Sequence, residues 1–418
     1  MGESKTARVP TPDQHAAVPF WRDVRVLRWL FQLAILVVVG ALLYFLINNL
    51  VTNLARLGLN LSFTFLNRPA GFNISEGYQV LQYDHRTSRM WHAFAVGVLN
   101  TLRAAGVGII LATILGTIVG VARLSRNWLV SRVSLAYIEI MQNTPLLVQL
   151  FFWFTLVKAL PRQRPGEILV LGDVTLGPLT IPPLAYFSQR AVALPGIEIH
   201  PSFRLWWPFL VVGLVVAAGL WLARVRMKER RGEPPTGQFW WAAGGFAAVL
   251  AVGWVLVPGA PVSLVLPGLE GETIAQYTGG WILSNTFQAL LLGLVLYTAA
   301  FIAEVVRSGI QSVPYGQIEA ATSLGLSRQQ QLRLIVLPQA MRVIIPPLIN
   351  QYLNLIKNSS LAIAVGYPDL FNISQTIGNQ TGQNIQVIAL VMATYLVISL
   401  IVSAIMNVAN QRMQIVER

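Results

Sequence analysis

Few residues in this sequence could carry out covalent chemistry, and those few do not gather into a recognisable pattern. The chain has no cysteine and only four histidines, so thiolate catalysis, disulfides and thiolate metal sites are excluded. Its 17 acidic residues are scattered along 418 positions without the clustering that a catalytic or metal-binding constellation needs. The sequence therefore predicts neither a catalytic residue nor a metal site.

Amide side chains recur instead inside apolar segments. Asn350, Asn354 and Asn358 are four residues apart, so a helix places them on one face, with Lys357 beside it. Amides both donate and accept hydrogen bonds, which suits a zwitterionic solute, although the same groups could simply hold helices together. We expect a path for a polar solute to be lined by Asn285, Gln288, Asn350, Asn354, Lys357, Asn358, Ser359 and Ser360.

A second pattern lies in a polar stretch between two apolar segments. Ile318, Ala321 and Leu324 are three residues apart, which predicts one apolar face of a short helix. Gly325 then permits a left-handed turn, and Ser327 can cap a second helix. The stretch is therefore predicted to form a bent helical hairpin on the membrane surface, shaped to fill a groove on a partner.

The composition indicates that membrane-spanning helices carry both patterns. Charged residues make up 11% of the chain and hydrophobic residues 55%, whereas a soluble domain is roughly 25% charged. A span needs about 20 apolar residues. Stretches that meet this need lie at residues 30–47, 104–122, 140–157, 205–223, 239–257, 283–303 and 385–407. The stretch 346–366 is too polar to meet it, but its apolar Leu and Ile and the parity of the chain ends indicate that it also crosses. The sequence therefore predicts an all-α polytopic protein with about eight spans.

The basic residues predict how these spans are oriented. With both termini inside, the cytoplasmic segments hold 19 Lys and Arg and the external segments hold 9. Short cytoplasmic loops retain positive charge, so this bias favours cytoplasmic termini. The basic run at 224–231 is interpreted as a topology anchor rather than a lipid-binding site, and the surplus of +13 does not indicate nucleic-acid binding.

One motif resembles a known family. Glu319-Ala320-Ala321, three residues, Gly325, nine residues, Ile335, one residue and Leu337-Pro338 resemble the signature loop of permease subunits of bacterial ATP-binding-cassette (ABC) importers at all seven fixed positions. The segments 137–147, 303–309 and 357–362 are similar to the polar amino acid permeases, although Gln142 stands where many relatives carry Arg. The insertion at 158–284 is similar to that of the longer, general L-amino acid permeases.

The resemblance implies a type I ABC importer fold and a set of partners. In this family two ATPase subunits bind ATP and Mg, two permeases form the pore, and a periplasmic protein delivers the solute. This chain has no Gly-rich phosphate loop, so it is expected to be a translocation subunit without a cofactor of its own, in the inner membrane. The resemblance places the contact with the ATPase at Gly316, Glu319, Ala320, Ala321, Gly325, Ile335, Leu337 and Pro338.

The substrate follows less directly. The polar path offers amides and hydroxyls with hardly any acid, so we expect polar and acidic L-amino acids such as Glu, Asp, Gln and Asn rather than Lys or Arg. A second permease is expected to be a related chain. A permease for another small polar solute, an ion-coupled secondary transporter and a membrane enzyme are the alternatives. The last two would need buried acids or a catalytic cluster, which the predicted spans lack.

These interpretations divide the chain into seven segments. They are a cytoplasmic tail (1–28), an additional span (29–48), an external segment (49–93), a first core part (94–157), an insertion with two spans (158–284), a second core part (285–410) that contains the coupling loop (308–345), and a cytoplasmic tail (411–418).

Overall fold

The computed structural model describes residues 24–56, 62–172, 174–176, 179–232, 237–271 and 276–413. The chain divides after Phe65 into two compact units. The first contains α1 (Val24–Arg56), whose large apolar side chains are exposed, as expected of a helix that contacts lipid. The additional span predicted at 29–48 lies inside α1. Of the tail predicted at 1–28, residues 24–28 belong to α1, and residues 1–23 lie outside the described residues.

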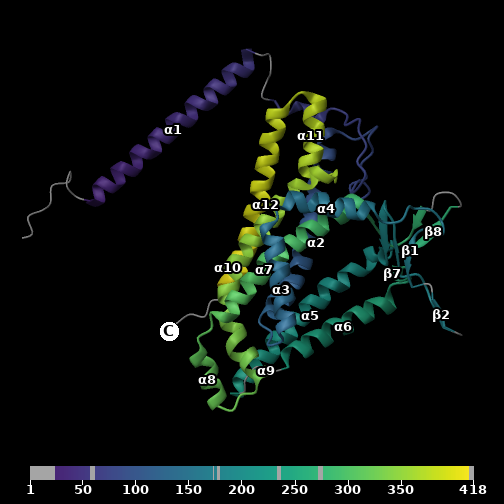
Figure 1. The fold of residues 1–418 in the computed structure, drawn as a ribbon, viewed down its shortest axis with the longest axis vertical. Helices are drawn as coiled ribbons and strands as arrows, with labels where there is room; N and C mark the ends of the chain where they lie inside the picture. The colour runs from purple at the N-terminus through teal and green to yellow at the C-terminus, as the bar shows by residue number, and fades with distance from the viewer. Residues whose placement is uncertain are drawn as a thin grey trace, which may run out of the picture. The chain divides into compact units, whose positions relative to one another are not determined.

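The core of the second unit is a bundle of four long helices (Figure 1). These are α2 (Met90–Arg123), α7 (Asn285–Gln311), α10 (Leu337–Asn358) and α12 (Asn384–Met413). Their buried side chains form one hydrophobic cluster, in which Ala112, Ile302 and Leu355 are fully buried. Each helix thus has a packed face toward its neighbours and leaves its other face for lipid or for a partner.

Two glycines let α2 and α7 approach closely. A Cβ atom on Gly116 would lie 2.8 Å from the carbonyl oxygen of Ala299, and one on Gly120 would lie 2.6 Å from that of Ala303. Side chains at these positions would therefore collide with the backbone of α7. The Gly-x-x-x-Gly spacing acts here as a helix-packing motif of the kind common in membranes.

One predicted span is wrong as a single helix. The segment 140–157 belongs to α3 (Trp128–Asn143) and α4 (Leu146–Lys158), which meet at 109°. Pro145 causes the break because it disfavours helical backbone at the residue before it, and Thr144 is extended. Gln149 Nε2 then holds the corner by donating to the carbonyl of Met141 at 2.9 Å.

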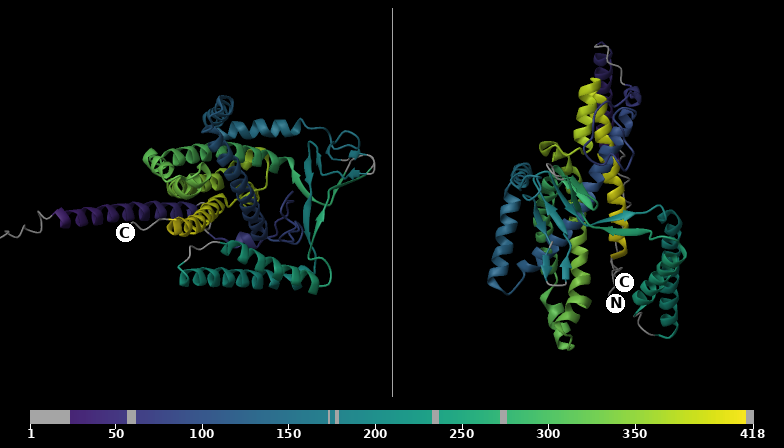
Figure 2. Two further views of the ribbon diagram at one scale, coloured as in Figure 1. Left: turned by 90° about the horizontal axis from the view of Figure 1, so that it is seen from below. Right: turned by 90° about the vertical axis from the view of Figure 1, so that its right-hand side faces the viewer.

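The insertion combines a helical hairpin with short strands. The helices α5 (Phe203–Arg230) and α6 (Gln238–Leu256) pack on each other and lie to one side of the other helices of the second unit in both views of Figure 2. Strands on either side of the hairpin pair with one another, because β6 pairs with β7 and β5 with β10. The strands are β1 (Leu169–Leu171), β2 (Val174–Leu176), β3 (Leu179–Ile181), β4 (Ala185–Phe187), β5 (Ala191–Leu194), β6 (Gly196–Ile199), β7 (Val262–Val265), β8 (Gly268–Glu270), β9 (Gln276–Thr278) and β10 (Trp281–Ser284).

The strands β1, β4, β5 and β10 form one antiparallel sheet in that order. In it Trp281 faces Leu194 and Ser284 faces Ala191. The sheet ends directly at α7, so the residues at 283 and 284, predicted to begin a span, are extended and the helix begins at Asn285. The remaining strands form two-stranded ribbons, β2 with β3, β6 with β7 and β8 with β9.

By length and composition, seven described helices could cross a membrane, or eight if α3 and α4 form one bent span. The other predicted spans each coincide with one helix. The exception is the span predicted at 346–366, which consists of the part of α10 from Pro346 onward and a 3-10 helix, η3 (Ser359–Val365). The helix α11 (Leu370–Thr381) follows it. A short 3-10 helix, η1, covers Thr64–Asn67.

Candidate functional site

The motif at 316–338 forms a short helix and a tight turn. The helix α8 (Tyr315–Ser323) ends at Gly325, whose φ is +74°. The N–H of Gly325 donates to the carbonyl of Thr322 at 2.9 Å, and that of Leu326 donates to Ala321 at 3.1 Å. This pair of bonds is a Schellman motif, which requires a left-handed residue, and glycine adopts that conformation without strain.

A second helix starts at once. Ser327 caps α9 (Arg328–Gln331), and the Ser327 N–H donates to Oε1 of Gln330 at 2.8 Å in a capping box. Gln331 Nε2 donates to the carbonyl of Leu326 at 2.8 Å and to Oγ1 of Thr322 at 3.1 Å. The predicted helix, glycine turn and helix are therefore confirmed, and side-chain bonds fix the angle between the two helices.

A widened turn joins α9 to α10. Residues Leu332–Val336 form a π-helix, η2, in which the N–H of Leu337 donates to the carbonyl of Leu332, five residues earlier. Pro338 follows at the first turn of α10. Proline has no N–H and clashes with the carbonyl four residues before it, so a π turn ahead of it relieves that clash.

The two faces of α8 differ in exposure. Ala321 is buried and Ile318 packs against the bundle core beside Val313 and Val336, so movement of α8 must move these core residues. Leu324 was expected on the same apolar face, but it caps the helix end and is 80% exposed. Of the other predicted coupling residues, Ile335 is half-buried, and the exposed ones are Gly316, Glu319, Ala320, Gly325, Leu337 and Pro338.

The exposed part of this hairpin combines large apolar side chains with a carboxylate. Tyr315 is 71% exposed and stands one turn before Glu319, and Leu324 lies beyond the helix end. Large apolar side chains exposed around a carboxylate are typical of protein interfaces.

The predicted polar path divides between two places. On α10, Asn350, Asn354 and Lys357 are exposed, whereas Tyr352 and Leu355 on the opposite face are buried in the bundle. Polar groups in a span usually face protein or water. Because this stripe faces away from its own bundle, a partner or an aqueous path must cover it.

The remaining path residues are engaged locally. Ser359 is fully buried and its hydroxyl donates to the carbonyl of Ile356 at 2.7 Å, so it lies off the exposed stripe. Asn358 and Ser360 are half-buried, and Ser360 donates to the carbonyl of Lys357. Two further amides hold the sheet to α7: Asn285 donates to Gln189 at 3.1 Å and Gln288 donates to Leu283 at 2.8 Å.

A buried polar cluster at the other end of the bundle was not predicted. Glu76, in the loop before α2, pairs with Arg103 at 3.5 Å and accepts a hydrogen bond from the hydroxyl of Ser284. The guanidinium of Arg103 lies 4.7 Å from the ring centre of Phe287. The cluster therefore joins the loop 66–89 to α2 and to the start of α7.

A second buried carboxylate belongs to the same region. Asp369 is fully buried and caps α11 by accepting from the N–H of Asn372 at 2.8 Å, while the hydroxyl of Tyr395 donates to it at 3.4 Å. Asn100 Nδ2 donates to the carbonyls of Glu76 and Pro368. The expectation that acids are scarce holds for the spans, but two are buried beside them.

Burial controls the ionisation of both acids. Desolvation raises the pKa of Glu76 to about 7, and the nearby Arg103 charge opposes that rise only in part. Desolvation likewise raises the pKa of Asp369 to about 7, against hydrogen bonds to the carboxylate. The signals for this cluster lie far apart in the sequence, at residues 76, 103, 284 and 369, so no local spacing could reveal it.

These pKa values predict how stability depends on pH. A carboxyl whose folded pKa is raised stabilises the protein fully below its unfolded pKa, and that contribution is lost as pH rises through the folded pKa near 7. We expect the melting temperature to fall between pH 5 and pH 8, and Glu76→Gln to flatten that fall. Differential scanning fluorimetry of the purified complex measures both. An identical slope in wild type and Glu76→Gln would contradict the assignment.

Comparison with known proteins gives the family. Residues 108–415 match the family described as "Binding-protein-dependent transport system inner membrane component". The chain is 41% identical to the putative amino-acid ABC transporter permease protein YhdX of Escherichia coli, over 93% of this chain and 95% of that one.

Two further relatives match at similar length. The general L-amino acid transport system permease protein AapQ of Rhizobium johnstonii is 37% identical over 93% of this chain and 92% of its own. The glutamate/glutamine/aspartate/asparagine transport system permease protein BztB of Rhodobacter capsulatus is 38% identical over 95% and 96%. With the hairpin and the helix bundle described above, these matches show that the chain belongs to the binding-protein-dependent inner membrane components and is a permease subunit of an ABC importer, which works with a separate ATPase and a binding protein.

Proposed function

We propose that this permease imports polar L-amino acids, with glutamate, aspartate, glutamine and asparagine as its range. The observation that carries the proposal is the stripe of Asn350, Asn354 and Lys357, which is exposed on α10 within a membrane span. Amides can pair with both the carboxylate and the ammonium group of the solute, and Lys357 adds a cation for a second carboxylate. The names of the relatives from Rhizobium and Rhodobacter, a general L-amino acid permease and a glutamate/glutamine/aspartate/asparagine permease, support the same class.

The stripe also supports the proposed assembly. Because it faces away from its own bundle, a second permease subunit, a related chain with its own polar face, closes the path. Two ATPase copies bind the two permeases through hairpins such as α8–α9, and a periplasmic binding protein supplies the amino acid. ATP and Mg belong to the ATPase subunits.

The proposed orientation puts the α8–α9 hairpin and both termini in the cytoplasm of a bacterial inner membrane. The basic residues at the end of α5, Lys228 and Arg230, then face the cytoplasm with the hairpin. The loop 66–89, the strands of the insertion and α11 face the periplasm.

Uptake by the reconstituted complex tests the substrate range. ATP-driven accumulation of labelled Glu, Asp, Gln and Asn is expected to exceed that of Lys and Arg. Asn354→Ala and Lys357→Ala should each lower uptake by roughly 10- to 150-fold, since a lost hydrogen bond to a charged group costs roughly 1.5–3 kcal/mol. The matched control is Gln380→Ala, which removes an exposed amide from α11 and should leave uptake unchanged.

Different outcomes reject different parts of the proposal. Transport confined to Lys and Arg would overturn the substrate class. Uptake unaffected by both α10 variants would overturn the assignment of the path, while the assignment to the ABC permeases, which rests on the family match, would stand.

A further inference from the structure

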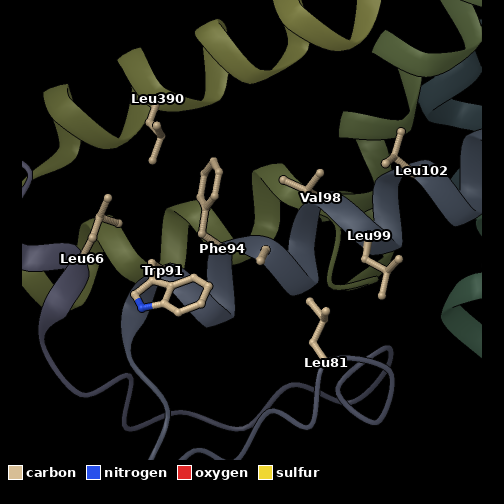
Figure 3. Close-up of a pocket in the computed structure, with 9 residues that line it drawn as sticks. Leu66, Leu81, Trp91, Phe94, Val98, Leu99, Leu102 and Leu390 are labelled. Atoms are coloured by element: carbon tan, nitrogen blue, oxygen red, sulfur yellow. The ribbon is translucent and has the colours of Figure 1, made fainter.

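An apolar groove runs along the outer part of α2 (Figure 3). Its volume is about 520 Å³, and hydrophobic and aromatic side chains line it. They come from the loop before α2, from one face of α2 and from α12, and include Leu66, Trp91, Phe94, Val98, Leu102 and Leu390. Neither the coupling hairpin nor the polar stripe uses this groove.

The groove is about as long as one lipid leaflet is deep. Leu390 is six residues past Asn384, the first residue of α12, which at 1.5 Å per residue puts it about 9 Å into that span. From Trp91 to Leu102 the groove follows about 16 Å of helix. One leaflet has about 15 Å of hydrocarbon, half of the 30 Å core, so the groove has the length of one acyl chain.

Two arginines lie within two residues of groove-lining side chains. Arg68 follows Leu66 by two residues, and Arg89 precedes Trp91 by two. Their backbones are held together, because the N–H of Met90 donates to the carbonyl of Arg68 at 2.9 Å and Pro69 forms a β-bridge with Arg89.

Both guanidinium groups are open to a ligand. Arg68 and Arg89 are exposed, and neither forms an ion pair with an acid in the described part of the chain. The exposed acid of this loop, Asp84, is already engaged by the N–H of Arg86 and the hydroxyl of Thr87. Most Lys and Arg residues of this chain lie in the predicted cytoplasmic segments, so arginines in an external loop are exceptions. The proposed transport function gives these two arginines no role.

We propose that the groove binds an anionic phospholipid of the outer leaflet, with one acyl chain along α2 and its phosphate between Arg68 and Arg89. The apolar side chains of the groove suit the acyl chain of the lipid. The positive charges of the two arginines complement the phosphate and the remaining negative charge of the headgroup. Trp91, at the junction, has the amphipathic ring that favours the membrane interface. This inference rests on the proposed orientation, which puts the loop 66–89 outside.

Photolabelling tests the site directly. The importer complex is reconstituted in vesicles of phosphatidylcholine that contain a trace of phosphatidylglycerol with a diazirine in one acyl chain, and labelled peptides are mapped by mass spectrometry. We expect labelling within residues 91–102. Added phosphatidylglycerol should compete more strongly than the same amount of phosphatidylcholine.

Two sets of substitutions distinguish the site for the acyl chain from the site for the headgroup. Ala95→Phe fills the groove and should abolish labelling, whereas Gly106→Phe, at an exposed position on the same helix, should not. Arg68→Gln combined with Arg89→Gln should reduce the preference for phosphatidylglycerol over phosphatidylcholine about thirtyfold. Each arginine is expected to contribute about 1 kcal/mol to the binding of the anionic headgroup. Arg86→Gln with Arg190→Gln removes the same charge from the same side and should leave the preference intact.

Several results would overturn the proposal. These are labelling that survives Ala95→Phe, equal competition by the two lipids in the wild type, or a crosslink from this peptide to the second permease in place of lipid. Uptake is measured in the same vesicles. If the wild-type complex transports amino acids but is not labelled within residues 91–102, the lipid site alone is rejected. If the wild-type complex is labelled there but does not transport polar amino acids, the proposed function alone is rejected.

Discussion

Replacing Gly325 by valine is expected to abolish ATP-driven uptake while the subunit stays in the membrane. Gly325 has a φ of +74° and open space around it, so the substitution causes no collision and acts only on the backbone. A left-handed conformation costs a residue with a side chain roughly 1–2 kcal/mol, and more when the Cβ is branched. The Schellman turn should therefore open and displace α8 from the angle that docking requires. Uptake and membrane content of the variant are measured together.

Gly232→Val is the matched control. Gly232 also has a positive φ, +69°, with open space around it, and follows the end of a helix, α5, on the same proposed side of the membrane. It lies in the insertion, so the same backbone strain should leave uptake near the wild-type rate. Equal uptake by Gly325→Val and wild type would refute the role assigned to the turn.

Gly120→Leu should prevent the core from assembling. The first atom of the new side chain would lie 2.6 Å from the carbonyl oxygen of Ala303, and a backbone atom in the middle of α7 cannot move aside. Overpacking of a core costs roughly 1–3 kcal/mol, and a collision with backbone lies at or above the upper end. We expect little folded protein in the membrane and a sharply lower melting temperature.

The control for this change lies on the same helix. Gly106 has nothing within 4 Å of an added Cβ and is exposed, so Gly106→Leu should be neutral or slightly stabilising. Normal levels and stability of Gly120→Leu would show that α2 and α7 do not pack as described.

The features predicted correctly from the sequence depend on neighbouring residues. The α8–α9 hairpin follows from Gly325, Ser327 and the apolar spacing, all within a dozen positions, so local propensity and capping determine it. The spans follow from long charge-free runs, because lipid excludes unpaired backbone groups and leaves the helix as the solution.

The features that were missed depend on contacts between distant parts of the chain or on one residue within an apolar run. The bend between α3 and α4 arises at Pro145, which a search for long apolar stretches without charge does not detect. The ion pair of Glu76 with Arg103 and the burial of Asp369 depend on how the loop 66–89 and α11 fold onto α2. Leu324 has the apolar spacing of its neighbours but falls at the helix end, where the phase of the helix no longer directs its side chain.

The most direct test of the central claim is a crosslink from the hairpin to the ATPase. A photoreactive amino acid at Leu324, which is 80% exposed beyond α8, should form an adduct with the ATPase subunit in membranes that contain the whole importer. The same amino acid at Met227, exposed near the inner end of α5, should form none. An adduct at 324 whose yield changes when ATP is added is the result we predict. The absence of any ATPase adduct at 324, in a complex that transports amino acids, would contradict coupling through this hairpin.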